Sequence, residues 1–226
     1  FNHEASYDFG TGSVSYRPVS NFIYFFDVHF FNAQPLGSHL INLVIHSVNT
    51  GIVYLIVFGL FNSNIFAFFT ALFFSLHPIQ SEAVSVMSYR ADILSAMFCF
   101  SSFYCWIKFK QGNYSQKWYG FKSLFLYFLG LFSKESVLPL PILIFLIDEL
   151  IGTKAALRKR IGYYFIFLLI ASGYLYIYFF VFKNISMHFY FIGGSLVSHV
   201  AMMGYICSKY LNCIFFFWTV KLIPGL

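Results

Sequence analysis

Apolar residues run along this chain in blocks that are separated by short polar stretches. The clearest block covers residues 40–60, where a few polar side chains give way to an apolar run. A helix needs about 20 apolar residues to cross a bilayer, and this block has that length. Further blocks follow at residues 65–76, 91–107, 121–132, 137–151, 161–182, 189–208 and 211–223. The pattern predicts an all-α protein, a polytopic integral membrane helical bundle with about eight spanning or re-entrant segments.

Two of the blocks are too short to cross a bilayer as straight helices. Residues 65–76 and 121–132 hold 12 residues each, which correspond to about 18 Å of helix against a hydrocarbon core of about 30 Å. We therefore expect these segments either to extend into their flanks or to be re-entrant. Non-helical backbone at membrane depth must be covered by protein or line a cavity, so the short segments favour a cavity.

The beginning of the chain is more polar and predicts a different organisation. Residues 1–21 are turn-rich and are interpreted as a loop. Residues 22–31 are aromatic, but Asp27 interrupts them, so we expect an interfacial helix and not a span. We divide one architectural domain into an outer loop with this helix, residues 1–39, and a transmembrane helical region, residues 40–226. No tetratricopeptide repeat pattern occurs in the sequence.

Composition strengthens the membrane prediction. Of the 226 residues, 59% are hydrophobic and 10% are charged, and the mean hydropathy is +0.73. Soluble domains carry about 25% charged residues because their surface faces water, so a soluble globular class and a disordered class are both excluded. The net charge is +6, but an excess of Lys and Arg in a membrane protein reports orientation, and no nucleic-acid partner is expected.

Charge also predicts the orientation in the membrane. If all the blocks span, the 14 Lys and Arg residues divide nine to five between the two sides. The positive-inside rule then makes the richer side cytoplasmic. Most of the acidic residues fall on or near the opposite face, and a polar group of this kind indicates a site. We expect a protein of the bacterial inner membrane or the endoplasmic reticulum membrane, with its active face periplasmic or lumenal.

The strongest local signal lies between two apolar blocks, where His77, Glu82, Arg90 and Asp92 fall within 16 residues. Such groups are costly near lipid unless they pair or serve a ligand. The planar fork of an arginine donates two hydrogen bonds at once, so we predict that Arg90 binds a donor phosphate. Glu82 and Asp92 are predicted catalytic carboxylates, and His77 is predicted to shape the site. The alternative is that Arg90, Asp92 and Glu82 merely neutralise one another.

Other ionisable residues extend this candidate site. Lys134 and Glu135 are sequence neighbours that do not share a helix face, so Lys134 is expected to meet a phosphate or an acidic residue of another loop, unless the pair occupies a solvated turn. Arg17 either binds phosphate or extends to anionic lipid headgroups. Glu135 and His39 are predicted to shape the site. Asp8 is a candidate base, although a loop carboxylate is more often simply hydrated.

No metal site and no cofactor are predicted, and a need for a divalent ion is left open. His39, Asn42 and His46 share one helix face turned away from lipid, at spacings i, i+3 and i+7. Interhelical hydrogen bonding suits them better than metal binding because no third ligand follows at a useful spacing. The cysteines have no zinc spacing and are interpreted as packing residues.

Several short segments occur in an order that resembles a known family. They are residues 15–20 (SYRPVS), 35–42 (PLGSHLIN) with His46, 77–84 (HPIQSEAV), 90–95 (RADILS), 133–135 (SKE) and 138–141 (LPLP). Together they resemble the membrane part of the transmembrane and tetratricopeptide-repeat (TMTC-like) proteins, over about residues 8–150. The resemblance implies a partial glycosyltransferase fold of the GT-C type with its site at the outer membrane face.

The resemblance also implies a reaction and its partners. The donor would be a polyprenyl- or dolichyl-phosphate sugar, expected to be mannose, and the acceptor a Ser or Thr of a protein or another hydroxyl. The family's acidic pair would precede Phe1, so we expect the chain to be a piece of a longer protein whose repeat region is missing here. The alternative is a non-enzymatic membrane protein, either a transporter or a scaffold, or an inactive fragment of the transferase. A transporter of this size would show repeat symmetry in its hydropathy, and we find none.

Overall fold

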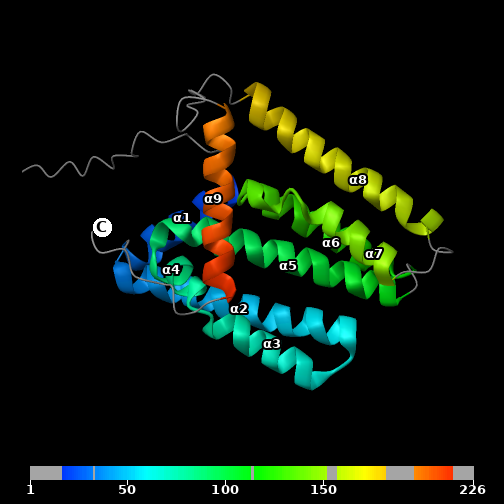
Figure 1. The fold of residues 1–226 in the computed structure, drawn as a ribbon, viewed down its shortest axis with the longest axis horizontal. Coiled ribbons are helices and arrows are strands. Elements are labelled where there is room, and N and C mark those ends of the chain that lie inside the picture. Colours follow the sequence, from blue (N-terminus) through cyan, green and yellow to red (C-terminus); the bar gives the residue numbers. More distant parts are fainter. Residues whose placement is uncertain (1–16, 33, 113–114, 152–156, 182–195, 216–226) are drawn as a thin grey trace, which may run out of the picture.

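The structure is a computed structural model that describes residues 17–32, 34–112, 115–151, 157–181 and 196–215. Within these ranges every regular element is helical (Figure 1). The α-helices are α1 (Pro18–Phe31), α2 (Pro35–Phe61), α3 (Asn64–Leu76), α4 (Ile79–Ser85), α5 (Arg90–Gln111), α6 (Lys117–Leu131), α7 (Leu140–Ile151), α8 (Leu157–Tyr176) and α9 (Leu196–Phe215). Short turns of other helix types are η1 (Met87–Tyr89), η2 (Glu135–Val137) and η4 (Ile177–Val181). The all-α prediction is confirmed for the described residues.

The centre of the molecule is α5, which packs against α2 on one side and α6 on the other (Figure 1). α3 folds back on α2 after Asn62, which ends α2 in the left-handed conformation (φ 50°) that Asn tolerates. A core of large aromatic side chains lies between α5, α6 and α8. Trp106, Tyr127 and Phe167 are almost completely buried there, and the rings of Tyr127 and Phe167 meet edge to face, 5.1 Å apart.

A buried ionic cluster joins the far ends of α5 and α7 to the start of α8. Asp148 has no exposed surface and accepts hydrogen bonds from Trp106 Nε1 at 3.0 Å and from the Tyr164 hydroxyl at 2.6 Å. Lys110 Nζ lies 3.3 Å and Arg160 Nη1 3.5 Å from the same carboxylate. Hydrogen bonds and opposite charges of this kind offset the cost of burying a carboxylate, so three helices are held together at this end.

The number of membrane spans differs from the prediction. Within the described ranges, two helical stretches are long and apolar enough to cross a bilayer, Pro35–Phe61 and Arg160–Phe180. A third is possible if α4 and α5 form one span, with a bend of 100° at the break between them. α3 is apolar but has 13 residues, and α6 and α7 have 15 and 12. The predicted total of about eight spans is therefore not confirmed.

Two predicted boundaries are wrong. α2 begins at Pro35, inside the region predicted as outer loop, because a proline suits the first position of a helix. The blocks at 189–208 and 211–223 were expected to be separate, but α9 runs without a break from Leu196 to Phe215. Lys209 does not stop this helix, because lysine is among the residues that favour a helix.

Candidate functional site

Ionised side chains from three distant parts of the chain meet at one end of the helices. Arg17, just before α1, lies with its Nη2 atom 3.1 Å from Oε1 of Glu135 in η2, 118 residues away. Lys134 forms an ion pair with Asp92 in the first turn of α5. The exposed fractions of these side chains run from 23% for Lys134 to 40% for Glu135. Both ion pairs are therefore open to a ligand on one side.

This geometry decides between the interpretations of Lys134. The prediction that Lys134 and Glu135 do not satisfy each other, and that Lys134 meets an acidic residue of another segment, is confirmed. The segment carrying both is docked on α1, because the Ser20 hydroxyl donates to the Ser133 carbonyl at 3.0 Å and the Val19 amide donates to the Phe132 carbonyl at 3.3 Å. These bonds bring Arg17 next to η2.

Arg90 lies beneath this cluster and has no exposed surface. Its Nη1 atom is 2.7 Å from Oδ2 of Asp27, Nε donates to the Asn42 side-chain carbonyl at 3.0 Å and Nη2 donates to the Ser38 carbonyl at 3.3 Å. The alternative in which Arg90, Asp92 and Glu82 neutralise one another is not what the structure shows. The carboxylate partner of Arg90 is Asp27, and a phosphate would reach this arginine only if α1 moved.

Asp27 is the residue that sequence reasoning missed. It was interpreted only as a polar interruption of an aromatic run, yet its side chain is 2% exposed and accepts a hydrogen bond from the Ser38 hydroxyl. A carboxylate within an apolar helix must be paired or neutralised. The sequence alone could therefore have indicated that Asp27 has a partner. It could not have identified Arg90 as that partner.

Tyr24 binds α1 to the start of α5. Its ring lies under the Arg90 guanidinium, 4.7 Å from the centroid, and its hydroxyl donates to the Met87 carbonyl in η1 at 2.7 Å. Burial raises the pKa of Tyr24 above its ordinary value, and the charge of Arg90 opposes this shift. The hydroxyl therefore stays protonated at neutral pH and remains a donor.

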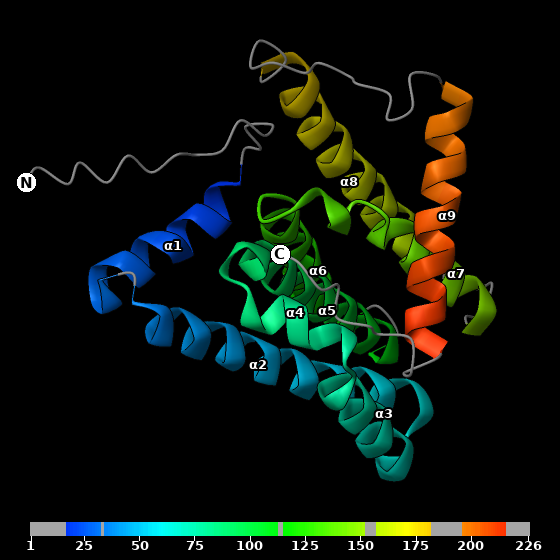
Figure 2. The ribbon, with the colours of Figure 1, turned by 60° about the vertical axis from the view of Figure 1, so that its left-hand side comes forward.

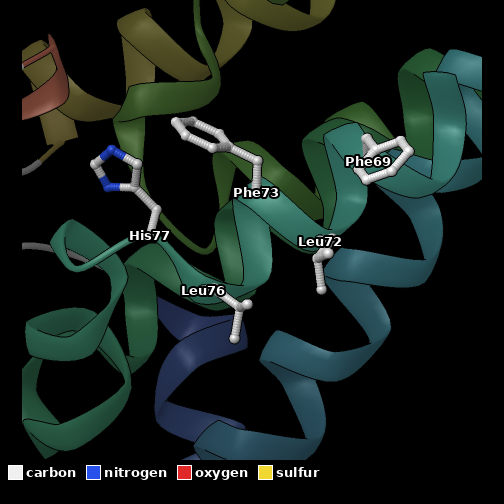
Figure 3. Close-up of a pocket in the computed structure, with 5 residues that line it drawn as sticks. All are labelled: Phe69, Leu72, Phe73, Leu76 and His77. Atoms are coloured by element: carbon white, nitrogen blue, oxygen red, sulfur yellow. The ribbon is translucent and has the colours of Figure 1, made fainter.

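His77 lies between α3 and α4, at the boundary between the apolar face of α3 and the polar candidate site. α3 ends at Leu76, two residues before Pro78, which has no amide donor with which to continue a helix. Figure 3 shows the imidazole of His77 and the ring of Phe73 at the rim of a hollow of about 440 Å³. Its other lining residues are Phe69, Leu72 and Leu76. The hollow is thus apolar apart from His77.

Two further hollows continue from this one toward the ion pairs. The second has a volume of about 340 Å³, shares Phe73 and His77 with the first and reaches Gln80. The third, of about 200 Å³, shares Gln80 with the second and is lined by Asp92. Neighbouring hollows that share lining residues therefore occur between the apolar face of α3 and the carboxylate that Lys134 binds.

The remaining predicted residues do not join the cluster. Glu82 is exposed on α4 and forms no ion pair with another described residue, and Asp8 lies outside the described residues. Asn42 and His46 are buried and reach neighbouring segments, with Asn42 Nδ2 donating to the Val84 carbonyl at 3.1 Å and His46 Nε2 lying 3.4 Å from the Ser75 carbonyl. His39, expected on the same covered face, is exposed. The prediction that His39 lies on a covered face is therefore wrong. Helix periodicity places it on the same face as Asn42 and His46, but it does not say how far along that face a neighbouring helix extends.

Among the residues that the structure describes, no three His, Cys, Asp or Glu side chains are grouped so that they could hold a metal ion. The polar groups at this end of the helices are cations, carboxylates and hydroxyls. Lys134 and Arg17 can attract an anion, and the Asp92 carboxylate can accept a proton.

Comparison with known proteins gives one family. A family model described as dolichyl-phosphate-mannose-protein mannosyltransferase matches residues 17–177. Among curated proteins, the Xenopus laevis protein O-mannosyl-transferase tmtc2 is 35% identical over 94 residues, which are 42% of this chain and 11% of that protein. The Caenorhabditis elegans protein O-mannosyl-transferase F38B6.6 is 30% identical over 105 residues, 44% of this chain and 15% of that protein.

The human protein O-mannosyl-transferase TMTC3 is 31% identical over 104 residues, 46% of this chain and 11% of that protein. The chain thus spans between 11% and 15% of the length of these relatives. No solved structure matches it.

Proposed function

The chain belongs to the dolichyl-phosphate-mannose-protein mannosyltransferase family, and from this premise we propose that it contributes to the transfer of mannose from a dolichyl- or polyprenyl-phosphate donor to a hydroxyl acceptor. A Ser or Thr of a protein is the acceptor that we propose. The site would face the lumen of the endoplasmic reticulum or the periplasm. The observation that carries the proposal is the pair of half-exposed ion pairs, Arg17 with Glu135 and Lys134 with Asp92, together with the hollows that lie between the apolar face of α3 and Asp92.

The donor phosphate is assigned to Lys134 and Arg17. Both cations lie at the surface of the cluster and both have a carboxylate partner that a phosphate can replace. Arg90 is enclosed, so we assign it the indirect role of holding α1, and with it Arg17, in place. The positive charges of Lys134 and Arg17 would stabilise the phosphate as it departs from the sugar.

The lipid part of the donor is assigned to the face of α3. Its exposed phenylalanines and leucines surround a hollow that ends at His77. An isoprenoid chain can lie along such a surface, which is apolar enough to replace contact with lipid tails. In this arrangement His77 marks the boundary between the lipid and the phosphate, and Glu135 shapes the polar side.

The reaction is an inverting displacement at the anomeric carbon. The acceptor oxygen forms a bond to that carbon while the bond from the carbon to the phosphate oxygen breaks, and the phosphate leaves with the electron pair. A carboxylate takes the acceptor proton. Asp92 is the candidate that we favour, because the phosphate would release its carboxylate from Lys134 within the site, whereas Glu82 and Asp8 are candidates only as carboxylate residues.

The proposal is tested with the full-length protein in membranes, supplied with labelled dolichyl-phosphate mannose and a Ser- and Thr-containing peptide. We expect Lys134→Gln and Arg17→Gln each to lower the transfer rate by about 10²-fold, because each removes a positive charge from the departing phosphate. Lys209→Gln makes the same change on α9 and is the matched control. Transfer at the control rate by both site variants would contradict the proposal and favour a scaffold whose charges only neutralise one another.

A further inference from the structure

A second polar hollow lies at the opposite end of α5 from the candidate site. Reciprocal hydrogen bonds between Ser102 and Ser123 set the register of α5 and α6, with the Ser102 hydroxyl donating to the Ser123 carbonyl at 2.7 Å and the Ser123 hydroxyl to the Ser102 carbonyl at 2.8 Å. The two helices are antiparallel, so the last turn of α5 lies beside the first turn of α6 (Figure 1). A hollow of about 350 Å³ opens there, lined by Lys108, Gln111, Gly112, Gln116 and Tyr119.

The charge around this hollow is positive and is not neutralised by the described residues. Lys108, Lys117 and Lys122 form no ion pair with a carboxylate in the described part of the chain, whereas the nearby Lys110 is held by Asp148. α6 has no acidic residue in its first turn, so the positive end of its helix dipole adds to the lysine charges. The chemistry of the hollow therefore fits an anion.

Aromatic rings place the lysines at the level of lipid headgroups. The ammonium of Lys108 lies 5.6 Å from the centre of the Tyr104 ring. That of Lys122 lies 5.2 Å from the Trp118 ring and 5.9 Å from the Tyr119 ring. Trp and Tyr concentrate at membrane–water interfaces, where one edge is apolar and the other is wet. Farther along α6 the exposed side chains are apolar, and they suit acyl chains.

We propose that this lysine–aromatic hollow, which is lined by Lys108, Gln111, Gln116 and Tyr119 and has Lys122 beside the Tyr119 ring, binds the headgroup of an anionic phospholipid. The 22 residues of α5 correspond to about 33 Å of helix, close to the thickness of a bilayer core. If α5 crosses the bilayer, the lipid belongs to the leaflet opposite the candidate transfer site. The occupant is a lipid and not a soluble anion, because the apolar face of α6 adjoins the charged hollow. This site does not depend on the proposed mannosyl transfer.

The test is native mass spectrometry of the purified full chain in detergent, titrated with phosphatidylglycerol, with phosphatidylcholine of the same acyl chains, or with inorganic phosphate. We expect phosphatidylglycerol to bind most tightly. The double variant Lys108→Gln/Lys122→Gln should weaken its binding by about tenfold or more, as two lysines near an anionic lipid surface would. Lys108→Arg/Lys122→Arg keeps both charges and should retain the preference.

Lys209→Gln serves as a control, because it removes a lysine that also lies over a tyrosine ring but on α9. Equal affinity for the two phospholipids would overturn the proposal, and so would an equal loss of binding in the control and the double variant. Inorganic phosphate binding as tightly as phosphatidylglycerol would also overturn it, because the site would then recognise a soluble anion.

Discussion

At the scale of single residues, two kinds of ion pair coexist at the candidate site. Arg90 and Asp27 are removed from solvent, with exposed fractions of 0% and 2%. Removing two charges from water costs several kcal/mol per ion, and only mutual attraction together with further hydrogen bonds offsets that cost. Asn42 and Ser38 supply those bonds. The Lys134–Asp92 pair keeps contact with water, so its net contribution to stability is small.

This difference predicts the stability of two aspartate variants. Asp27→Ala leaves the Arg90 guanidinium buried without its partner, so we expect a loss of about 3–5 kcal/mol in the free energy of unfolding. Asp92→Ala breaks a half-exposed pair and should cost about 1 kcal/mol or less. The measurement is denaturant unfolding of the purified full chain in detergent. Equal losses would show that the Arg90 pair is not buried as described.

At the scale of elements, close approach between helices depends on small residues. Gly120 on α6 faces α8, and a Cβ atom added there would lie 2.6 Å from Cε1 of Tyr163. The Tyr163 ring cannot simply turn away, because Phe109 packs against it with the ring centroids 4.7 Å apart. Gly162, on α8 itself, has no neighbouring atom within 4 Å of the same added atom. One helical glycine is therefore required by packing and the other is not.

Alanine substitutions separate these two glycines. Gly120→Ala should destabilise the protein by about 1–3 kcal/mol, because the added methyl group forces α6 and α8 apart. Gly162→Ala should stabilise it by about 0.5–1 kcal/mol, because alanine restricts the unfolded chain and favours the helix. Thermal unfolding in detergent measures both changes. A stabilising Gly120→Ala would mean that α6 and α8 do not touch at this position.

The elements themselves were largely predictable from the chain. Apolar blocks gave helices close to their predicted places at α2, α3, α5 and α6, and Pro78 marked the end of α3. The break expected between two blocks near Lys209 did not occur, because lysine is a good helix former even where it interrupts an apolar block. Hydropathy alone does not distinguish a charged helical residue from a charged loop.

At the scale of the whole molecule, α5 separates two polar ends of different character. One end carries the ion pairs of Arg17, Lys134 and Asp92, and the other carries the buried Asp148 cluster and the lysine–aromatic hollow. Figure 2 shows α1 and α2 at an angle to each other, with α4 and α5 on the inner side of that angle. If α5 crosses the bilayer, the two ends must face opposite sides.

Cysteine labelling tests this orientation. In a background without native cysteines, Ser81→Cys and Ser136→Cys should both react with an impermeant thiol reagent from the same side of the membrane, because both are exposed at the first end. Gln116→Cys, exposed at the second end, should react only from the other side. The measurement is made on sealed vesicles of each orientation. Labelling of Ser81→Cys and Ser136→Cys from opposite sides would contradict the candidate site.

The sequence by itself determined the membrane class, the helical architecture and several of the ionisable residues of the candidate site, because hydropathy and local charge are properties of short segments. The tertiary structure decided which charges pair. Arg17 meets Glu135 across 118 residues, and Arg90 meets Asp27 and not its sequence neighbours. Those choices depend on how α1, α5 and η2 pack, and electrostatic attraction between buried groups depends on distance in space. The local pattern of the chain therefore could not specify them.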